Sequence, residues 1–167
     1  MKNIILIITG LLFYSCTQQM NNHKYIILDN NSINLENIKK LDSPEKALLS
    51  AYLFVYGNEC NTSSDKVKCK ILNTLQIVDE CSESHQKFLQ KWFKTEGILY
   101  YKLKKCPVLP IKGAIQNQFK TISIERNLDV LSITIHVVGM NTSQEKNWDI
   151  KQTNSYKIIN NSFQKIN

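Results

Sequence analysis

Residues 130–138 read VLSITIHVV, and this stretch decides the fold class of the chain. The odd positions from Leu131 to Val137 are apolar, whereas the even positions from Ser132 to His136 are polar. A period of two residues is typical of a β-strand that buries one face and exposes the other. The stretch therefore predicts a strand of an antiparallel sheet whose apolar face lies on a core.

Segments on both sides of this strand repeat the period of two. They are residues 98–103, 119–126, 147–159 and 162–166. Residues 127–129 and 139–143 are rich in turn-forming types, and Asn160-Asn161 suits a tight turn because asparagine tolerates a positive φ. The second half of the chain is thus predicted to be a meander of antiparallel strands.

A helical pattern precedes the strands. Ser43-Pro44-Glu45 combines an N-cap residue, a proline at the first helical position and an acidic residue in the first turn, so it predicts the start of a helix. Apolar side chains from Ala47 to Val55 recur at helical spacing, and Gly57 is a suitable terminator.

Two more helices are expected before the sheet. Asp65 is the expected cap of the first and Ser82 of the second, and Gly97 marks the end of the second. Their apolar positions are Val67, Ile71, Leu72, Leu75 and Val78 in the first, and Phe88, Leu89, Trp92 and Phe93 in the second. The predicted fold is α+β, with about three N-terminal helices packed on a curved antiparallel sheet of four to six strands.

The length of 167 residues suits one domain, and a hydrophobic content of 43% is ordinary for a globular protein. We expect a signal peptide at residues 1–15, a lipid-attached polar tether at 16–42 and a single α+β domain at 43–167. The tether contains one short apolar segment, residues 25–28, which we interpret as a short strand or docking segment.

The N-terminus has the pattern of an export signal. Lys2 provides a positive charge, and residues 4–13 form an apolar run that is too short to span about 30 Å of hydrocarbon. The run is followed by Leu12-Phe13-Tyr14-Ser15-Cys16, which resembles the lipobox of bacterial lipoproteins, although the aromatic pair departs from the strict pattern.

This resemblance implies cleavage before Cys16 and attachment of fatty acyl chains to Cys16, which would anchor the protein to a membrane. Thr17-Gln18-Gln19 follows Cys16, with no aspartate directly beside the cysteine, and by the same resemblance this favours the outer membrane, facing the periplasm. The alternatives are an ordinary cleaved signal peptide with an incidental Cys16, or an uncleaved short anchor.

Four cysteines remain after Cys16, namely Cys60, Cys69, Cys81 and Cys106. An even number in an oxidising compartment indicates two disulfides, and of the three pairings we favour Cys60 with Cys69 and Cys81 with Cys106. A four-cysteine zinc site is the competing interpretation, but no two of these cysteines have the close spacing that zinc sites use.

The chain is basic, with 21 Lys and Arg against 14 Asp and Glu and a net charge of +7. The charges are scattered rather than gathered on one face with aromatic residues, so we expect no nucleic-acid partner. The two densest groups, residues 66–70 and 102–105, are interpreted as solvated faces.

The order of elements resembles the nuclear-transport-factor-like, or cystatin-like cone, superfamily. A helix that opens with Ser43-Pro44-Glu45 precedes further helices and a curved sheet, and residues 155–166 resemble the final hairpin of that family. The resemblance covers residues 43–167 and implies a conical pocket that different members use for catalysis, ligand holding or protein contact.

The chain lacks the phosphate-loop, dinucleotide-binding, zinc-protease and nucleophile-elbow motifs. A cone-type pocket would instead need an acid or histidine beside a donor such as tyrosine. The residues that suit such a pocket are His136, Asp149 with Tyr100 or Tyr101, Glu125 beside Arg126, and Trp148 at a ligand mouth. We assign no catalytic residue, no cofactor and no metal from the sequence.

His85 lies near Asp79, Glu80 and Glu83 in the sequence, so we expect it on the surface with a raised pKa. The favoured function is a non-catalytic envelope module that binds a protein partner or a small hydrophobic ligand through His136, Trp148 and Tyr100. The alternatives are a pocket enzyme of the isomerase or dehydratase kind, and a protective lipoprotein that neutralises a toxin or wall-cleaving enzyme.

Overall fold

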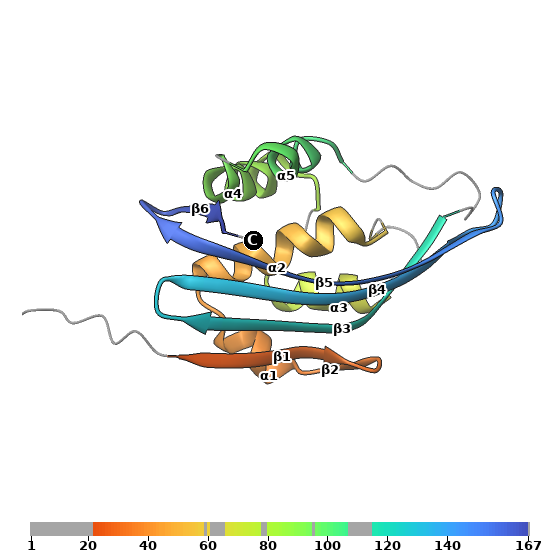
Figure 1. Ribbon diagram of the computed structural model, residues 1–167, viewed down its shortest axis with the longest axis horizontal. Helices are drawn as coiled ribbons and strands as arrows, with labels where there is room; N and C mark the ends of the chain where they lie inside the picture. Colours follow the sequence, from red (N-terminus) through yellow and green to blue (C-terminus); the bar gives the residue numbers. More distant parts are fainter. Residues whose placement is uncertain are drawn as a thin grey trace, which may run out of the picture.

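The computed structural model describes residues 22–58, 60, 66–77, 80–94, 96–106 and 115–166 (Figure 1). Within these ranges the chain forms five helices and six strands, and the α+β prediction is confirmed. In chain order they are β1 His23–Asp29, β2 Ser32–Ile33, α1 Leu35–Lys40, α2 Ser43–Tyr56, α3 Lys66–Thr74, α4 Glu83–Phe93, α5 Gly97–Leu103, β3 Ile115–Asn127, β4 Val130–Asn141, β5 Lys146–Ile159 and β6 Ser162–Lys165.

The strands form one antiparallel sheet in the order β2-β1-β3-β4-β5-β6. Strands β3 to β6 are the predicted meander, joined by tight turns. In the last turn Asn160 and Asn161 have φ values of 50° and 56°, which confirms the expected use of asparagine at positive φ. Figure 1 shows β3, β4 and β5 as the longest elements, extending past the helices at one end and bending there.

One face of the sheet carries the core. Leu131, Ile133 and Ile135 of β4 are fully buried and Val137 nearly so, as the alternation predicted. Helix α2 lies against this face and is itself buried over almost its whole length, from Ala47 to Phe54. The burial of these apolar side chains supplies most of the driving force for folding.

The domain extends further toward the N-terminus than the predicted boundary at residue 43. Strand β1 pairs with β3 along its length, and Ile27 and Leu28 are fully buried. Helix α1 then leads directly into α2. Residues 23–42 are therefore part of the folded domain and not of a tether, because the apolar segment at 25–28 completes the sheet beside β3.

The first turn of α2 is capped one residue earlier than expected. Asp42, not Ser43, is the N-cap: its side chain accepts a hydrogen bond from the Glu45 N–H, and the Glu45 side chain accepts one from the Asp42 N–H. This reciprocal pair is a capping box. The expected cap of α4, Ser82, is confirmed by a bond from the His85 N–H to its hydroxyl.

Residues 98–103 are helical, so the prediction of a strand there is wrong. Gly97 begins α5 and does not end α4, whose C-cap is Lys94. Leu99 and Leu103 are four residues apart, and Leu103 is fully buried while Leu99 packs on the core. This spacing of apolar contacts fits a helix, because residues at i and i+4 share a helix face.

The helices of the described ranges include none that is both long and apolar enough to cross a membrane. The predicted signal peptide, Cys16, Asp65 and Val78 lie outside the described residues.

Candidate ligand-binding site

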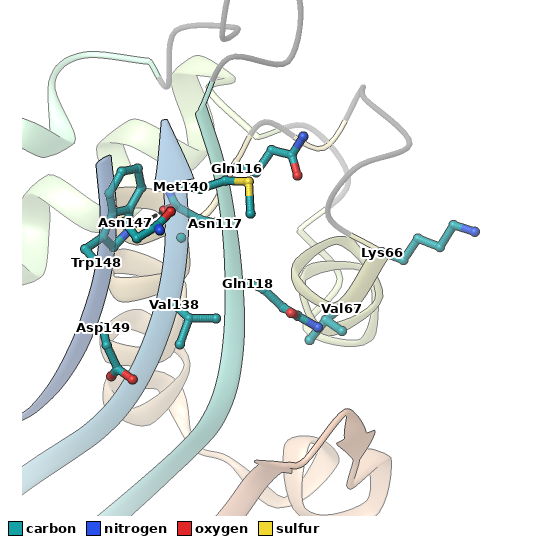
Figure 2. Close-up of a pocket in the computed structure, with 11 residues that line it drawn as sticks. Lys66, Val67, Gln116, Asn117, Gln118, Val138, Met140, Asn147, Trp148 and Asp149 are labelled. Carbon is teal, nitrogen blue, oxygen red and sulfur yellow. Dashed lines mark hydrogen bonds between the residues drawn. The ribbon is translucent and has the colours of Figure 1, made fainter. Parts of the chain in front are cut away.

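A hollow of about 740 Å³ lies at the free end of β3, β4 and β5, beside the first turn of α3 (Figure 2). Three consecutive rows of cross-strand partners line it. They are Gln116–Met140–Asn147, Asn117–Gly139–Trp148 and Gln118–Val138–Asp149. Lys66 and Val67 of α3 complete the lining, and Figure 2 shows Gln118 directed toward Val67 and Lys66 extending away from the strands.

Trp148 spans the middle row. Its indole N–H donates to Oδ1 of Asn117, 2.9 Å away and two strands across the sheet. The indole can cross β4 because residue 139 is glycine: a Cβ at Gly139 would overlap both the indole and the Asn117 side chain. The three residues therefore fix the orientation of a half-buried aromatic ring at the hollow.

Amide side chains dominate the polar part of the lining. Gln116, Asn117, Gln118 and Asn147 each carry both a donor and an acceptor, and none is charged. Val67, Val138 and Met140 supply apolar surface, with Met140 44% exposed. The lining thus combines neutral hydrogen-bonding groups with one aromatic ring, aliphatic contacts and two charged side chains, Lys66 and Asp149.

The carboxylate of Asp149 lies against His136. His136 Nε2 is 2.7 Å from Asp149 Oδ1, and the Asp149 side chain is 69% exposed. His136 is on the same sheet face as Val138 and Asp149 but two rows away from their row at the hollow. The pair provides a charge-assisted hydrogen bond at the rim.

The structure brings together some of the residues singled out from the sequence and separates others. Trp148 and Asp149 line the hollow, and His136 contacts Asp149. Tyr100 is on α5, where the Lys104 ammonium lies 4.3 Å from its ring centroid, so the expected grouping of Asp149 with Tyr100 is wrong. The alternation of residues 98–103 predicted a strand, and this wrong prediction placed Tyr100 on the sheet instead of on α5.

Glu125 and Arg126 point to different partners. Glu125 is 3.7 Å from Lys24, whereas Arg126 makes two bonds to Asp42, at 2.6 and 3.1 Å. Arg126 Nε also lies 3.4 Å from the buried Glu45 carboxylate. Arg126 therefore links the N-terminus of α2 to β3, and it does not form a common site with Glu125.

A buried polar cluster that sequence reasoning missed lies between α2, α3 and α4. Ser50 Oγ and His85 Nε2 are 2.7 Å apart, and His85 is only 4% exposed. Burial, with a contribution from the Lys68 ammonium, lowers the pKa of His85 to about 4, so the expected surface position and raised pKa are wrong. No substrate can reach this pair, and we interpret it as structural.

The nearby Lys68 is fully buried. It forms an ion pair with Glu80, whose side chain is 6% exposed, and donates to the Asn58 carbonyl oxygen at 2.6 Å. The expectation that residues 66–70 form a solvated face is wrong for Lys68. Helical spacing gave one signal, because Lys68 lies on the same face of α3 as the buried Ile71 and Leu72.

The cysteines differ in state. Cys81 and Cys106 form a disulfide with Cα atoms 5.6 Å apart, which is one of the two favoured pairings. Cys60 and Cys69 are thiols: Cys69 Sγ lies 3.5 Å from the Cys60 carbonyl oxygen, and burial raises the pKa of the Cys60 thiol. The two residues are neighbours, as expected, but not bonded.

The described residues contain no group of three or more His, Cys, Asp or Glu placed to hold a metal ion. Comparison of the chain with family models, with curated proteins and with solved structures finds no match. The fold and the hollow together define an α+β domain with an amide-lined site at the end of its sheet.

Proposed function

We propose that this protein is a lipid-anchored binding module of the cell envelope that holds a neutral, hydroxyl-rich ligand, such as a saccharide segment, in the hollow. The observation that carries the proposal is the lining itself: four uncharged amides line the hollow together with an indole that Asn117 and Gly139 hold in place. Binding sites of this size use a few oriented polar groups for specificity and apolar surface for affinity.

The chemistry of the lining favours this ligand class. A saccharide ring presents hydroxyl groups around its edge, which both donate and accept hydrogen bonds, as amides do. Its C–H face is flat and apolar, and it can pack on an indole. A purely hydrophobic ligand fits less well, because it would cover the amide groups of the lining without offering them hydrogen bonds in exchange for water.

Titration with a panel of neutral oligosaccharides tests the proposal. Trp148 is the half-buried tryptophan and Trp92 is 5% exposed, so a bound ligand should change the fluorescence of Trp148. We expect Trp148→Phe to weaken binding about tenfold, since it removes part of the aromatic surface and the N–H that orders Asn117. The matched variant Trp92→Phe should bind like the wild type.

Two outcomes would contradict this assignment. One is a ligand whose affinity, measured by calorimetry, is the same for Trp148→Phe and the wild type. The other is tight binding of apolar ligands together with no response to any saccharide in the panel.

The anchoring part of the proposal rests on Cys16 and the lipobox-like sequence before it. In cells given labelled fatty acid we expect the label on the wild-type protein and not on Cys16→Ser, which should leave the membrane fraction. Cys69→Ser is the control, because it changes a cysteine far from the N-terminus. Labelled Cys16→Ser protein would overturn the assignment of the acylation site.

The His136–Asp149 pair favours a second candidate, a small pocket enzyme. Its histidine is hydrogen-bonded to a carboxylate at the rim of the hollow, as a general base would be. Turnover of a bound saccharide or other small substrate that His136→Ala abolishes, while ligand affinity is retained, would support the enzyme and reject the non-catalytic module.

A further inference from the structure

Strand β5 has an open edge. On one side it pairs with β4 from Lys146 to Lys157, but on the other side β6 covers only Tyr156 to Ile159. The Ser155 carbonyl oxygen is also occupied, because it accepts from the Ile166 N–H at 2.9 Å. From Lys146 to Asn154, no other strand among the described residues pairs with this side of β5.

The direction of the Ser155 carbonyl defines which backbone groups the edge presents. It points away from β4, and the β4–β5 register has no shift, so every second residue toward Lys146 points the same way. These residues are Thr153, Lys151, Asp149 and Asn147. Their N–H and C=O groups form the row of donors and acceptors that an additional strand would meet.

The edge is symmetrical about Ile150, which is the midpoint between Lys146 and Asn154. An antiparallel second copy of the same edge, related by a two-fold axis at Ile150, would use the whole open length of both strands. Asp149 of each copy would then pair with Lys151 of the other copy, as a pair that exchanges two backbone hydrogen bonds. Asn147 would pair with Thr153 of the other copy in the same way.

The charges along the open edge support the same register, and this argument is separate from the one based on the length of the edge. The charged residues of the open edge are Lys146, Asp149 and Lys151, and the two-fold pairing places opposite charges together twice and like charges never. Lysine on an edge strand commonly prevents pairing with other chains. In this register Lys151 of each copy lies opposite Asp149 of the other. Cross-strand pairs of opposite charge stabilise a sheet, so the lysine favours pairing with a second copy instead of preventing it.

We propose that two copies of this chain associate through the β5 edges, from Lys146 to Asn154, to form a continuous antiparallel sheet with its two-fold axis at Ile150. The proposal does not depend on the ligand or on the lipid anchor. Asp149 belongs to both the edge and the rim of the hollow, so association would bring the two hollows onto one joined sheet.

A cross-linking experiment on the full chain tests the register. In an antiparallel sheet, residues opposite each other in the pair without mutual hydrogen bonds lie about 4.5 Å apart at Cα. Ile150→Cys should therefore form a covalent dimer on mild oxidation, visible on a non-reducing gel. Thr153→Cys is the matched control, since Thr153 would lie about 20 Å along the strand from its own copy.

Charge variants in the Ile150→Cys background test the pairing itself. Lys151→Asp places two aspartates opposite each other and should lower the dimer yield about tenfold at a fixed protein concentration. Adding Asp149→Lys to Lys151→Asp exchanges the two charges and should restore the yield. Lys151→Pro should also lower it, because the lost N–H points away from β4 and the domain remains folded.

The result that supports the dimer is cross-linking at Ile150→Cys alone, lost in Lys151→Asp and regained in the exchanged variant. Equal dimer yields at Ile150→Cys and Thr153→Cys would overturn the proposal, as would a yield at Ile150→Cys that neither charge variant changes. A purified chain that sediments as a monomer up to about 1 mM would overturn it as well.

Discussion

His85 is held between helices with its Nε2 beside Ser50 and its ring steeply inclined to the ring of Phe54, the two centroids 5.6 Å apart. Its surroundings disfavour the charged form in two ways: burial removes hydration, and the Lys68 ammonium adds repulsion. The Glu80 carboxylate also belongs to this cluster, but it is paired with Lys68. His85 is therefore a neutral core residue whose protonation opposes folding.

This gives a signed dependence of stability on pH. The pKa of His85 is about 4 in the folded protein against about 6.5 when unfolded, so the unfolded state binds more protons between these values. The contribution is fully present above pH 6.5 and is lost as the pH falls toward 4, on the order of 3 kcal/mol in total. His85→Gln should remove this part of the slope in urea unfolding measured from pH 7 to pH 4.

His136→Gln is the control for that measurement. It also removes a histidine, but His136 is partly exposed at the sheet surface, so the slope between pH 6.5 and 4 should remain. An unchanged slope in His85→Gln would show that His85 is not the group that titrates on unfolding.

At the scale of elements, the N-terminus of α2 is held to the sheet by side-chain contacts with β1 and β3. Asp42 accepts from the Glu45 N–H within the helix and from Arg126 of β3. His23 of β1 lies 2.6 Å from the same Glu45 carboxylate. One capping box thus aligns α2 with two strands that are far apart in the sequence.

We expect Asp42→Ala to lower the free energy of unfolding by about 1 to 3 kcal/mol, because it removes the cap and leaves Arg126 without its bidentate partner. Ser43→Ala should change it by less than about 0.5 kcal/mol, since Ser43 is already inside the helix. Denaturant unfolding of both variants measures the difference. A larger effect from Ser43→Ala would place the cap at residue 43.

At the scale of the whole molecule, the Cys81–Cys106 disulfide joins the chain before α4 to the chain after α5. Its sequence separation is 25 residues, and it encloses both helices that cover the β6 side of the sheet. A bridge of this loop length stabilises the domain by about 3 to 4 kcal/mol, mainly by restricting the unfolded chain.

Replacing both residues, as Cys81→Ser with Cys106→Ser, should lower the free energy of unfolding by that amount. A reductant should lower the stability of the wild type similarly and leave the double variant unchanged. If the reductant instead destabilised the double variant, a second bridge, between Cys60 and Cys69, would be present in solution.

Patterns within one element were predicted well from the sequence. The buried row from Leu131 to Val137, the Ser82 cap and the Asn160-Asn161 turn follow from side-chain periodicity and local hydrogen bonding, which involve residues close in the chain. The prediction of a strand at residues 98–103 is wrong because five of these six residues are apolar or aromatic, a pattern that fits either period. The burial of Leu103 on the core favours the helix.

The amino-acid sequence by itself determined the fold class, the meander and the order of its strands, because alternation and turn residues act locally. Only the tertiary structure decided the hollow, the burial of His85 and the open edge of β5. Each of these depends on which residues meet across strands and helices: Trp148 reaches Asn117 over Gly139, and Asp42 meets Arg126 across 84 positions of the chain. Such meetings are set by packing of the whole domain, and no local pattern encodes them.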